Sequence, residues 1–377
     1  MTRADALDLI RRFHDALNRH DVDTLVSFYS ADSVVVSPMF STLNGRDAIR
    51  QSYEDLFRLA PDYRVQPDES LFLFEGARAA DISTVNATHS NRLFGLAPTG
   101  HHIEYQIVRV MSFRGREIVQ EQRLYDIAAV LERLEKARLD DELRVAADIQ
   151  RTLLSRTDHR GPFFDAVGAS LPSRSIGGDF FEYIDLPSGA FGVALGDVSG
   201  KGPAAALVAA MMQGMFSIDA EVWHSPSETL ARMNRALVRR GIDRFATLVF
   251  GVVLRDGALT YANAGHVPPV LVRADGTVER LKTGGPPLGI FEDAAFPGAR
   301  VRLDSGDLVI FCSDGVTEAR QRGSDNWFGE ERLIDVAREH RAVEPAELIE
   351  EIFTAVRDFS DRDVPSDDVT VAVIRFL

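Results

Sequence analysis

The chain has 377 residues, of which 45% are hydrophobic and 26% charged, and its formal net charge is −15. This composition is typical of folded proteins, and the length favours two domains over one. The negative charge argues against nucleic-acid binding, which needs basic patches. The first residues lack a secretory pattern and no apolar run could span a bilayer, so we expect a cytoplasmic protein without membrane contact.

Residues 1–128 begin with helical periodicity and continue with strand patterns. Apolar spacing predicts helices over Ala4–Asn18, Asp23–Tyr29 and Ala48–Leu59. Turn-bounded runs then predict strands over Ser70–Phe74, Ala79–Thr88, His101–Phe113 and Glu117–Tyr125. Helices followed by a meandering antiparallel sheet predict a cone-like α+β domain.

Residues 129–158 are expected to form a helical linker. Apolar residues recur at three- and four-residue spacing from Ile127 to Leu153, with one five-residue step from Leu134 to Leu139. This pattern predicts a long amphipathic helix with a stutter, suited to a two-stranded coiled coil and therefore to a homodimer. The alternative is a helix that packs only on its own domain.

Residues 159–377 combine buried-type strands with amphipathic helices. Strands are predicted over Phe163–Leu171, Phe180–Asp185, Phe191–Asp197, Thr247–Leu254, Leu259–Ala262, Val270–Arg273, Asp307–Cys312 and Val369–Phe376. Helices are predicted over Pro203–Phe216, Ser227–Gly241, Glu331–His340 and Pro345–Arg357. These elements favour a sheet-on-sheet core flanked by helices.

Four aspartates lie in short turns beside the apolar runs of this second domain: Asp179, Asp197, Asp314 and Asp367. Carboxylates that face one cleft repel each other strongly unless cations lie between them. Hard divalent ions with oxygen ligands, Mg²⁺ or Mn²⁺, provide that charge. The pattern therefore predicts a binuclear metal hydrolase.

Seven segments occur in an order that carries more information than any one of them. They are Gly177-Gly-Asp-Phe-Phe, Gly196-Asp-Val-Ser-Gly-Lys-Gly-Pro-Ala-Ala, Phe245-Ala-Thr-Leu, Tyr261-Ala-Asn-Ala-Gly-His-Val-Pro-Pro, Pro287-Leu-Gly, Ser313-Asp-Gly-Val-Thr-Glu-Ala-Arg and Ser366-Asp-Asp-Val-Thr. Together they resemble the metal-dependent protein phosphatases (PPM), and among them the bacterial stage II sporulation protein E branch. The resemblance implies an α/β/β/α sandwich, two Mn²⁺ or Mg²⁺ ions, and hydrolysis of phosphoserine or phosphothreonine.

The resemblance also implies roles for individual residues. Asp197 corresponds to the carboxylate that bridges both metals, with the Val198 carbonyl on one of them. Asp314 and Asp367 correspond to ligands of the other metal, with Asp367 preferred over its neighbour Asp368. Asp179 corresponds to an acid that holds metal-bound water or binds a metal directly. Two such ions would activate a bridging water and clamp the attacking and leaving oxygens.

Two features of eukaryotic relatives have no counterpart in this sequence. Ser199 stands where those relatives have a histidine proposed as general acid, and no residue matches their phosphate-binding arginine. Lys201, within Gly200-Lys-Gly, could contribute positive charge or could serve the structure.

The first domain resembles the SnoaL-like polyketide cyclases of the nuclear transport factor 2-like superfamily. The matching segments are Phe28-Tyr-Ser-Ala-Asp, Leu43-Asn-Gly-Arg-Asp-Ala-Ile, Ala97-Pro-Thr-Gly-His-His and Ile118-Val-Gln-Glu-Gln-Arg-Leu-Tyr-Asp. The resemblance implies a cone with an apolar pocket for a small, unidentified ligand. Candidate pocket residues are His89, His102, Glu121, Arg123 and Tyr125, although ordinary sheet positions would explain them equally well.

These observations predict a dimeric serine/threonine phosphatase with an N-terminal ligand-sensing domain. By resemblance, its substrate would be a phosphorylated regulatory protein such as an anti-anti-sigma factor. One alternative makes the first domain a cyclase or isomerase for a small apolar substrate. Another makes the chain a signalling scaffold with a vestigial phosphatase site, although all four aspartates are present.

Overall fold

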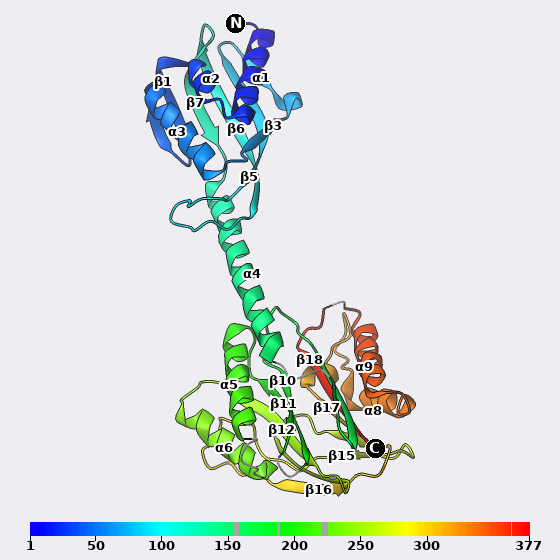
Figure 1. The fold of residues 1–377 in the computed structure, drawn as a ribbon. Helices are drawn as coiled ribbons and strands as arrows, with labels where there is room; N and C mark the ends of the chain where they lie inside the picture. The colour runs from blue at the N-terminus through cyan, green and yellow to red at the C-terminus, as the bar shows by residue number, and fades with distance from the viewer. Residues whose placement is uncertain (154–157, 187–188, 220–224, 363) are drawn as a thin grey trace. The chain divides into compact units, whose positions relative to one another are not determined.

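The computed structural model describes residues 1–153, 158–186, 189–219, 225–362 and 364–377. The chain divides into two compact units, Met1–Glu142 and Leu143–Leu377 (Figure 1). The boundary falls inside one helix, α4 (Ile127–Leu153), in the region where a linker helix was predicted. The expected continuation of that helix toward residue 158 crosses residues 154–157, which lie outside the described part of the chain.

Unit 1 contains three helices, one 3₁₀ turn and seven strands before α4. They are α1 (Arg3–Arg19), α2 (Val22–Ser27), β1 (Tyr29–Ser37), β2 (Ser41–Asn44), α3 (Gly45–Leu59), β3 (Arg64–Pro67), η1 (Glu69–Leu71), β4 (Leu73–Glu75), β5 (Arg78–Thr88), β6 (His102–Arg114) and β7 (Glu117–Leu124). Strands β1, β2 and β3 were not predicted. In β1 the register shifts between Tyr29 and Val34, so the strand shows no clean alternation in sequence.

The sheet of unit 1 is mixed. Its strand order is β2-β1-β7-β6-β5-β3, with β4 on β5. The prediction of a purely antiparallel meander is wrong at one place, because β1 and β7 pair in parallel. A parallel pair needs a long connection between its strands, and here that connection includes α3 and strands β3 to β6.

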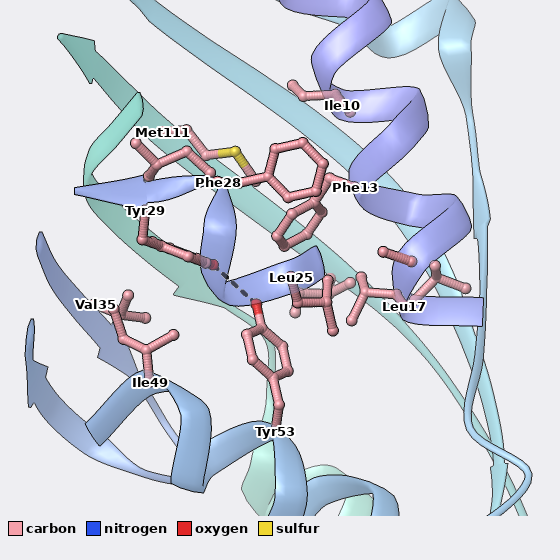
Figure 2. Packing of buried hydrophobic residues seen from close by; sticks show 14 of the residues in the cluster. Ile10, Phe13, Leu17, Leu25, Phe28, Tyr29, Val35, Ile49, Tyr53 and Met111 are labelled. Atoms are coloured by element: carbon pink, nitrogen blue, oxygen red, sulfur yellow. Dashed lines mark hydrogen bonds between the residues drawn. The ribbon is translucent and has the colours of Figure 1, made fainter. Parts of the chain in front are cut away.

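The core of unit 1 lies between this sheet and helices α1 and α3. Helix α1 begins with a capping box between Thr2 and Asp5, which satisfies backbone N–H groups of its first turn. Its buried face carries Phe13 and Leu17, which lie near Tyr29 and Tyr53 in Figure 2. The two tyrosine hydroxyls are 2.8 Å apart and hydrogen-bonded within this apolar core.

Unit 2 contains the last part of α4 and the remaining elements. They are β8 (Asp158–Arg160), β9 (Phe164–Leu171), β10 (Phe180–Asp185), β11 (Phe191–Val198), α5 (Pro203–Asp219), α6 (Pro226–Arg239), β12 (Ala246–Val253), β13 (Ala258–Ala264), β14 (Val270–Val272), β15 (Val278–Arg280), β16 (Gly298–Arg302), β17 (Leu308–Cys312), α7 (Asp314–Thr317), α8 (Gly329–Glu339), α9 (Pro345–Ser360) and β18 (Val369–Phe376). All predicted strands and helices of this region are present. The short elements β8, β15, β16 and α7 were not predicted.

The strands of unit 2 form two sheets, ordered β10-β11-β12-β13-β16 and β15-β14-β17-β18-β9-β8. Aromatic and aliphatic side chains from both sheets, including Phe191, Val249 and Phe311, form the core between them. Helices α5 and α6 pack on the outer face of the first sheet, and α8 and α9 pack on that of the second. The result is the expected α/β/β/α sandwich (Figure 1), and its central strands β11, β12 and β18 are buried along almost their whole length because both of their faces are covered.

Candidate metal centre

The predicted acids lie where strands of the two sheets begin or end. Asp179 directly precedes β10, and Asp197 is the second-last residue of β11. Asp314 opens α7 after β17, and Asp367 lies two residues before β18. Antiparallel pairing of β10 with β11 and of β17 with β18 places each pair of acids at one end of its sheet.

Three carboxyl groups of this cluster have raised pKa values, as expected for carboxylates that repel each other with no cation between them. Asp179 is buried, and burial together with the charge of Asp197 raises its pKa well above the usual range. Burial, followed by the charges of Asp314 and Asp367, raises the pKa of Asp197 to about 6. The pKa of Asp314 is raised by burial and by Glu318. Bound cations would relieve this repulsion.

Two glycines allow the chain to approach the cluster closely. A Cβ atom at Gly178 would lie 2.7 Å from the Val198 carbonyl oxygen and 3.1 Å from Asp197 Oδ1. A Cβ atom at Gly177 would lie 2.1 Å from Asp368 Oδ2. Only glycine fits this packing, so the segment before Asp179 is held directly against the Asp197 loop.

Asp367 and Asp368 differ in what their carboxylates bind. Both oxygens of Asp368 accept protein hydrogen bonds, Oδ1 from the Ser173 backbone at 2.7 Å and Oδ2 from the Gly178 backbone at 3.0 Å. Asp367 is half exposed, and its Oδ2 lies 2.9 Å from Lys201 Nζ. Asp368 therefore holds the Gly178 segment in place, whereas among the described residues Asp367 contacts the Lys201 ammonium group and accepts the backbone N–H of Asp368.

The charges of these acids suit a metal site, but their carboxylates do not yet converge on one point. Among the described residues, no three His, Cys, Asp or Glu side chains already surround one point as ligands. In that same part of the chain, the buried Asp179 Oδ2 has no hydrogen-bond partner. An orphaned buried carboxylate oxygen beside raised carboxyl pKa values is the chemistry expected of a Mg²⁺ or Mn²⁺ site. The Val198 carbonyl lies at the same loop, against Gly178.

The loop after Asp197 is held by the two residues that precede strand β12. The Ser199 backbone N–H donates to the Phe245 carbonyl at 2.9 Å, and Ser199 Oγ accepts the Phe245 backbone N–H at 3.1 Å. Arg244 Nη1 donates to the Ser199 carbonyl at 2.5 Å. Sequence reasoning assigned no role to Arg244, because its link to this loop depends on the pairing of β11 with β12.

His266 is buried in the turn after β13, and its ring Nε2 has no hydrogen-bond partner among the described residues. Its Nδ1 is 2.8 Å from Thr247 Oγ1, and its backbone N–H donates to Asn263 Oδ1 at 2.7 Å. Burial lowers the pKa of His266 to about 4, so the ring is neutral at neutral pH. These contacts give it a structural role in the turn after β13.

In unit 1, four of the five predicted pocket residues point inward or lie at the cavity rim. Glu121 is fully buried and accepts hydrogen bonds from Arg123 Nε at 3.0 Å and from the Tyr29 hydroxyl. His89 is buried, and its pKa is lowered by desolvation. The Tyr125 hydroxyl accepts the Met39 backbone N–H at 3.1 Å.

His102 does not line the interior, and the prediction that it does is wrong. It is exposed and lies 3.2 Å from Asn86 Oδ1. Side chains alternate along a strand, and in β6 it is the odd-numbered positions such as Arg109 and Met111 that face inward.

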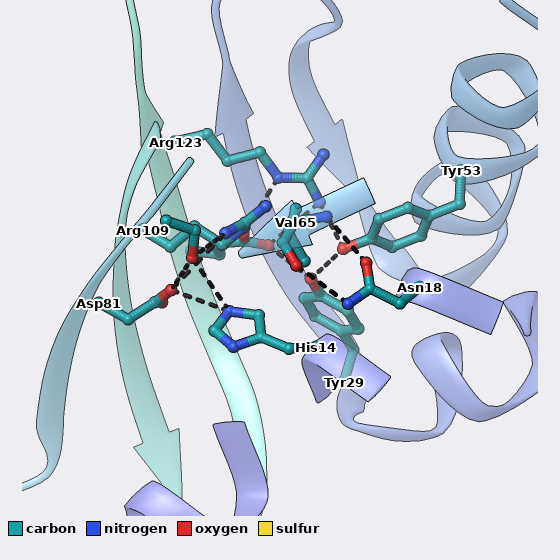
Figure 3. A network of polar contacts seen from close by, with 10 residues as sticks. His14, Asn18, Tyr29, Tyr53, Val65, Asp81, Arg109 and Arg123 are labelled. Carbon is teal, nitrogen blue, oxygen red and sulfur yellow. Dashed lines mark hydrogen bonds and ion pairs between the residues drawn. The ribbon is translucent and has the colours of Figure 1, made fainter. Parts of the chain in front are cut away.

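The interior of unit 1 holds a longer polar network than the sequence predicted. His14 Nε2 lies 3.0 Å from Asp81 Oδ2, and Arg109 lies 3.6 Å from Asp81 and 3.8 Å from Glu121. Arg123 Nη2 donates to the Tyr53 hydroxyl at 2.8 Å. Two arginines thus balance two carboxylates inside the cone, as Figure 3 shows for Asp81, Arg109 and Arg123. The sequence did offer one signal of this network, because Arg109 occupies an inward-facing position on the predicted strand His101–Phe113.

The cavities beside this network are small. Two of about 20 Å³ each lie inside the cone; one is lined by Arg109, Arg123 and Tyr125, and the other by His89. Each has room for about one water molecule. A larger, open pocket of about 450 Å³ lies at the surface and shares Met39 with both.

Comparison with known proteins agrees with both halves of this description. The family described as "Stage II sporulation protein E (SpoIIE)" matches residues 187–377, and the family "SnoaL-like polyketide cyclase" matches residues 7–134. Phosphoserine phosphatase RsbU of Bacillus subtilis is 30% identical over 243 residues, which cover 63% of this chain and 70% of RsbU.

Solved structures add support for the fold. The SiaA-PP2C domain of Pseudomonas aeruginosa aligns with a TM-score of 0.56 at 20% identity, over 64% of this chain and 99% of that domain. The RsbU and RsbW domains of Rv1364c from Mycobacterium tuberculosis align with a TM-score of 0.50 at 25% identity, over 57% and 60% of the two chains. Unit 2 thus has the fold of PP2C-type, or PPM, phosphatase domains.

The chain belongs to the SpoIIE family of PPM phosphatases and carries a SnoaL-like domain at its N-terminal side. Within the described residues, none of the helices combines the length and the apolar character that a bilayer crossing requires.

Proposed function

We propose that the chain is a metal-dependent protein serine/threonine phosphatase whose substrate is a phosphorylated regulatory protein, with an anti-anti-sigma factor as the first candidate. The observation that carries this proposal is the cluster of Asp179, Asp197 and Asp314, whose carboxyl pKa values are all raised. The similarity to phosphoserine phosphatase RsbU supports the substrate class.

The proposed ligands are Asp179, Asp197, Asp314 and Asp367, with the Val198 carbonyl. Two Mg²⁺ or Mn²⁺ ions held there would supply a water nucleophile at neutral pH and charge stabilisation for an in-line displacement. The chain's own residues fix this arrangement. Asp368 holds Gly178 against the Asp197 loop through its hydrogen bond to the Gly178 backbone.

Among the described residues near this cluster, the Cys312 thiol and the Ser199 hydroxyl are poor candidates for a nucleophile that forms a covalent phosphoenzyme. Cys312 is buried in β17, and burial raises the pKa of its thiol to about 12. Ser199 Oγ is engaged by the Phe245 backbone. Direct attack by water is therefore the reaction that these residues favour.

The test is hydrolysis of p-nitrophenyl phosphate with Mn²⁺, with Mg²⁺ and with neither. We expect metal-dependent turnover that falls at least 100-fold in Asp197→Asn and in Asp314→Asn. Asp293→Asn, an exposed acid of the same unit, is the matched control and should retain wild-type activity. Metal-independent turnover, or full activity in both cluster variants, would contradict the proposal.

We also propose that unit 1 senses a small ligand and that the chain acts as a homodimer through α4. The open pocket of about 450 Å³ that Met39 lines supports a ligand entrance, because Met39 also lines a small cavity inside the cone. Several apolar side chains of α4 are exposed, as a dimer contact requires: Leu139, Val145, Ile149 and Leu153.

A further inference from the structure

Arg244 lies in the segment between α6 and β12, and its side chain contacts the loop that follows Asp197. Strands β11 and β12 pair Asp197 with Thr247 and Val198 with Ala246, which brings Arg244 beside the residues that follow Asp197. Its Nη1 donates to the Ser199 carbonyl. The guanidinium also lies against Gly200, where a Cβ atom would be 2.0 Å from Nη1. A fixed positive charge therefore borders the proposed metal centre.

Most of the hydrogen-bond donors of Arg244 have no acceptor among the described residues. Within the described part of the chain it forms no ion pair, and the Ser199 carbonyl is the acceptor that it contacts. Since an arginine has five N–H donors, most of its hydrogen-bonding capacity is open. By contrast Lys201, a cation on the loop after Asp197, contacts Asp367 and the Ser366 carbonyl, both at 2.9 Å. A half-buried arginine without a carboxylate is notable in a chain of net charge −15.

The proposed substrate requires such a group. A phosphate monoester is anionic, and a cleft lined by carboxylates repels it even when cations neutralise part of their charge. Fixed donors aimed at a transferring phosphoryl group stabilise its transition state, and guanidinium matches phosphate oxygens in a bidentate geometry. The bond to Ser199 restricts the side chain before substrate arrives.

We propose that Arg244 binds the phosphoryl group of the substrate. This inference rests on the proposed phosphatase function and adds a residue for which the sequence offered no counterpart. The competing role is purely structural: Arg244 could hold the loop of Ser199 and Gly200, and so act on the metal ligands through Asp197. The two roles differ in what they change, because a structural role alters metal affinity and a substrate role alters phosphate affinity.

The experiment compares wild type, Arg244→Gln, Arg244→Lys and the control Arg240→Gln, an exposed arginine at the end of α6. Four quantities are measured: kcat and KM for p-nitrophenyl phosphate at saturating Mn²⁺, the inhibition constant of inorganic phosphate, and Mn²⁺ affinity by calorimetry. For Arg244→Gln we expect kcat/KM to fall about 100-fold and phosphate inhibition to weaken about tenfold, with Mn²⁺ affinity unchanged. Arg244→Lys should give intermediate values of kcat/KM and phosphate inhibition, because lysine keeps the positive charge but cannot donate two parallel hydrogen bonds to phosphate.

The outcomes separate this inference from the proposed function. Wild-type turnover with equal phosphate inhibition in Arg244→Gln would overturn the inference alone. So would a loss of Mn²⁺ affinity in that variant with phosphate inhibition unchanged, since that pattern marks the structural role. Absence of turnover in both wild type and Arg240→Gln would contradict the proposed function, and the inference with it.

Discussion

At the residue scale, the aspartate cluster places like charges where they destabilise the metal-free fold. Asp197 has a carboxyl pKa of about 6, above the ordinary value of 3.8. A folded-state pKa that is raised means that the folded protein holds a proton which the unfolded chain releases. The metal-free protein therefore loses stability as pH rises from about 4 to 6, and the loss persists above pH 6.

The first prediction concerns this loss. Asp197→Asn should stabilise the metal-free protein at pH 7.5 by about 1–3 kcal/mol, because the variant carries no charge at this position. The difference should shrink toward pH 4, where the wild-type carboxyl is protonated. Chemical denaturation in EDTA at pH 4.5 and 7.5 measures it, with Asp293→Asn as control. Equal stability of variant and wild type at pH 7.5 would contradict the prediction.

The second prediction concerns Lys201, whose ammonium group forms an ion pair with the Asp367 carboxylate. A metal that binds Asp367 must displace it. Lys201→Met should therefore raise Mn²⁺ affinity by about two- to fivefold, the range expected for a half-exposed ion pair. Calorimetric titration with Mn²⁺ measures the change, and Lys282→Met is the control. Weaker binding in Lys201→Met would show that the lysine supports the site instead of competing with it.

The third prediction concerns Glu121, which is fully buried between two arginines. Glu121→Gln removes the negative charge and leaves the positive charges buried, so unit 1 should lose about 3–5 kcal/mol. The exposed Glu117→Gln should change little. Both tryptophans, Trp223 and Trp327, come after residue 142 in the sequence, so the midpoint of their fluorescence change in denaturant should not shift, whereas circular dichroism should show earlier unfolding. A shift in both signals would contradict a local effect.

At the element scale, the end of α4 is attached to the segment that precedes Asp179. Gln150 Nε2 donates to the Gly177 carbonyl at 2.8 Å, and Gln150 Oε1 accepts the Gly177 backbone N–H at 3.2 Å. Leu143, Ala146 and Ala147 pack with Ile176 and Ala206 of the same unit. The helix thus contributes directly to the position of the acidic cluster.

The fourth prediction follows from these two hydrogen bonds. Gln150→Ala should lower the stability of unit 2 by about 1–2 kcal/mol and weaken Mn²⁺ binding, because the Gly177–Asp179 segment loses its support. Tryptophan fluorescence in denaturant and calorimetry measure the two effects. Arg151→Ala, an exposed neighbour on the same helix, should show neither. Unchanged metal affinity in Gln150→Ala would separate this helix from the site.

The long elements of unit 2 were predictable because covered strands are continuously apolar and capped helices carry strong end signals. Strand β16 was missed, because it alternates exposed and half-buried residues and contains two arginines. The four aspartates were predicted from their turns. Their partners were not: the Lys201–Asp367 contact and the Arg244–Ser199 bond join residues at least 45 positions apart, and only strand register brings them together.

At the scale of the whole molecule, α4 exposes apolar side chains that a monomer would leave in water. Leu139, Ile149 and Leu153 are each about half exposed. Pairing of two such helices would bury them. The fifth prediction is that the protein is a dimer in light scattering and that Ile149→Glu shifts it toward monomer, whereas Thr152→Glu on the same turn does not. A wild-type monomer at micromolar concentration would contradict the dimer.

The strand orders of the unit 1 sheet and of the second unit 2 sheet also determine which unit can complete its fold first while the chain is being synthesised. The parallel partner of β1 is β7, so the sheet of unit 1 is complete once the chain has been made through Leu124. The second sheet of unit 2 has β18 between β17 and β9, so it closes only after residue 376. Since domains fold as units while the chain grows, unit 1 is expected to be folded while the turn bearing Asp367 is still unmade. A newly made chain would thus complete the fold of unit 1 before the acidic cluster of unit 2 is assembled.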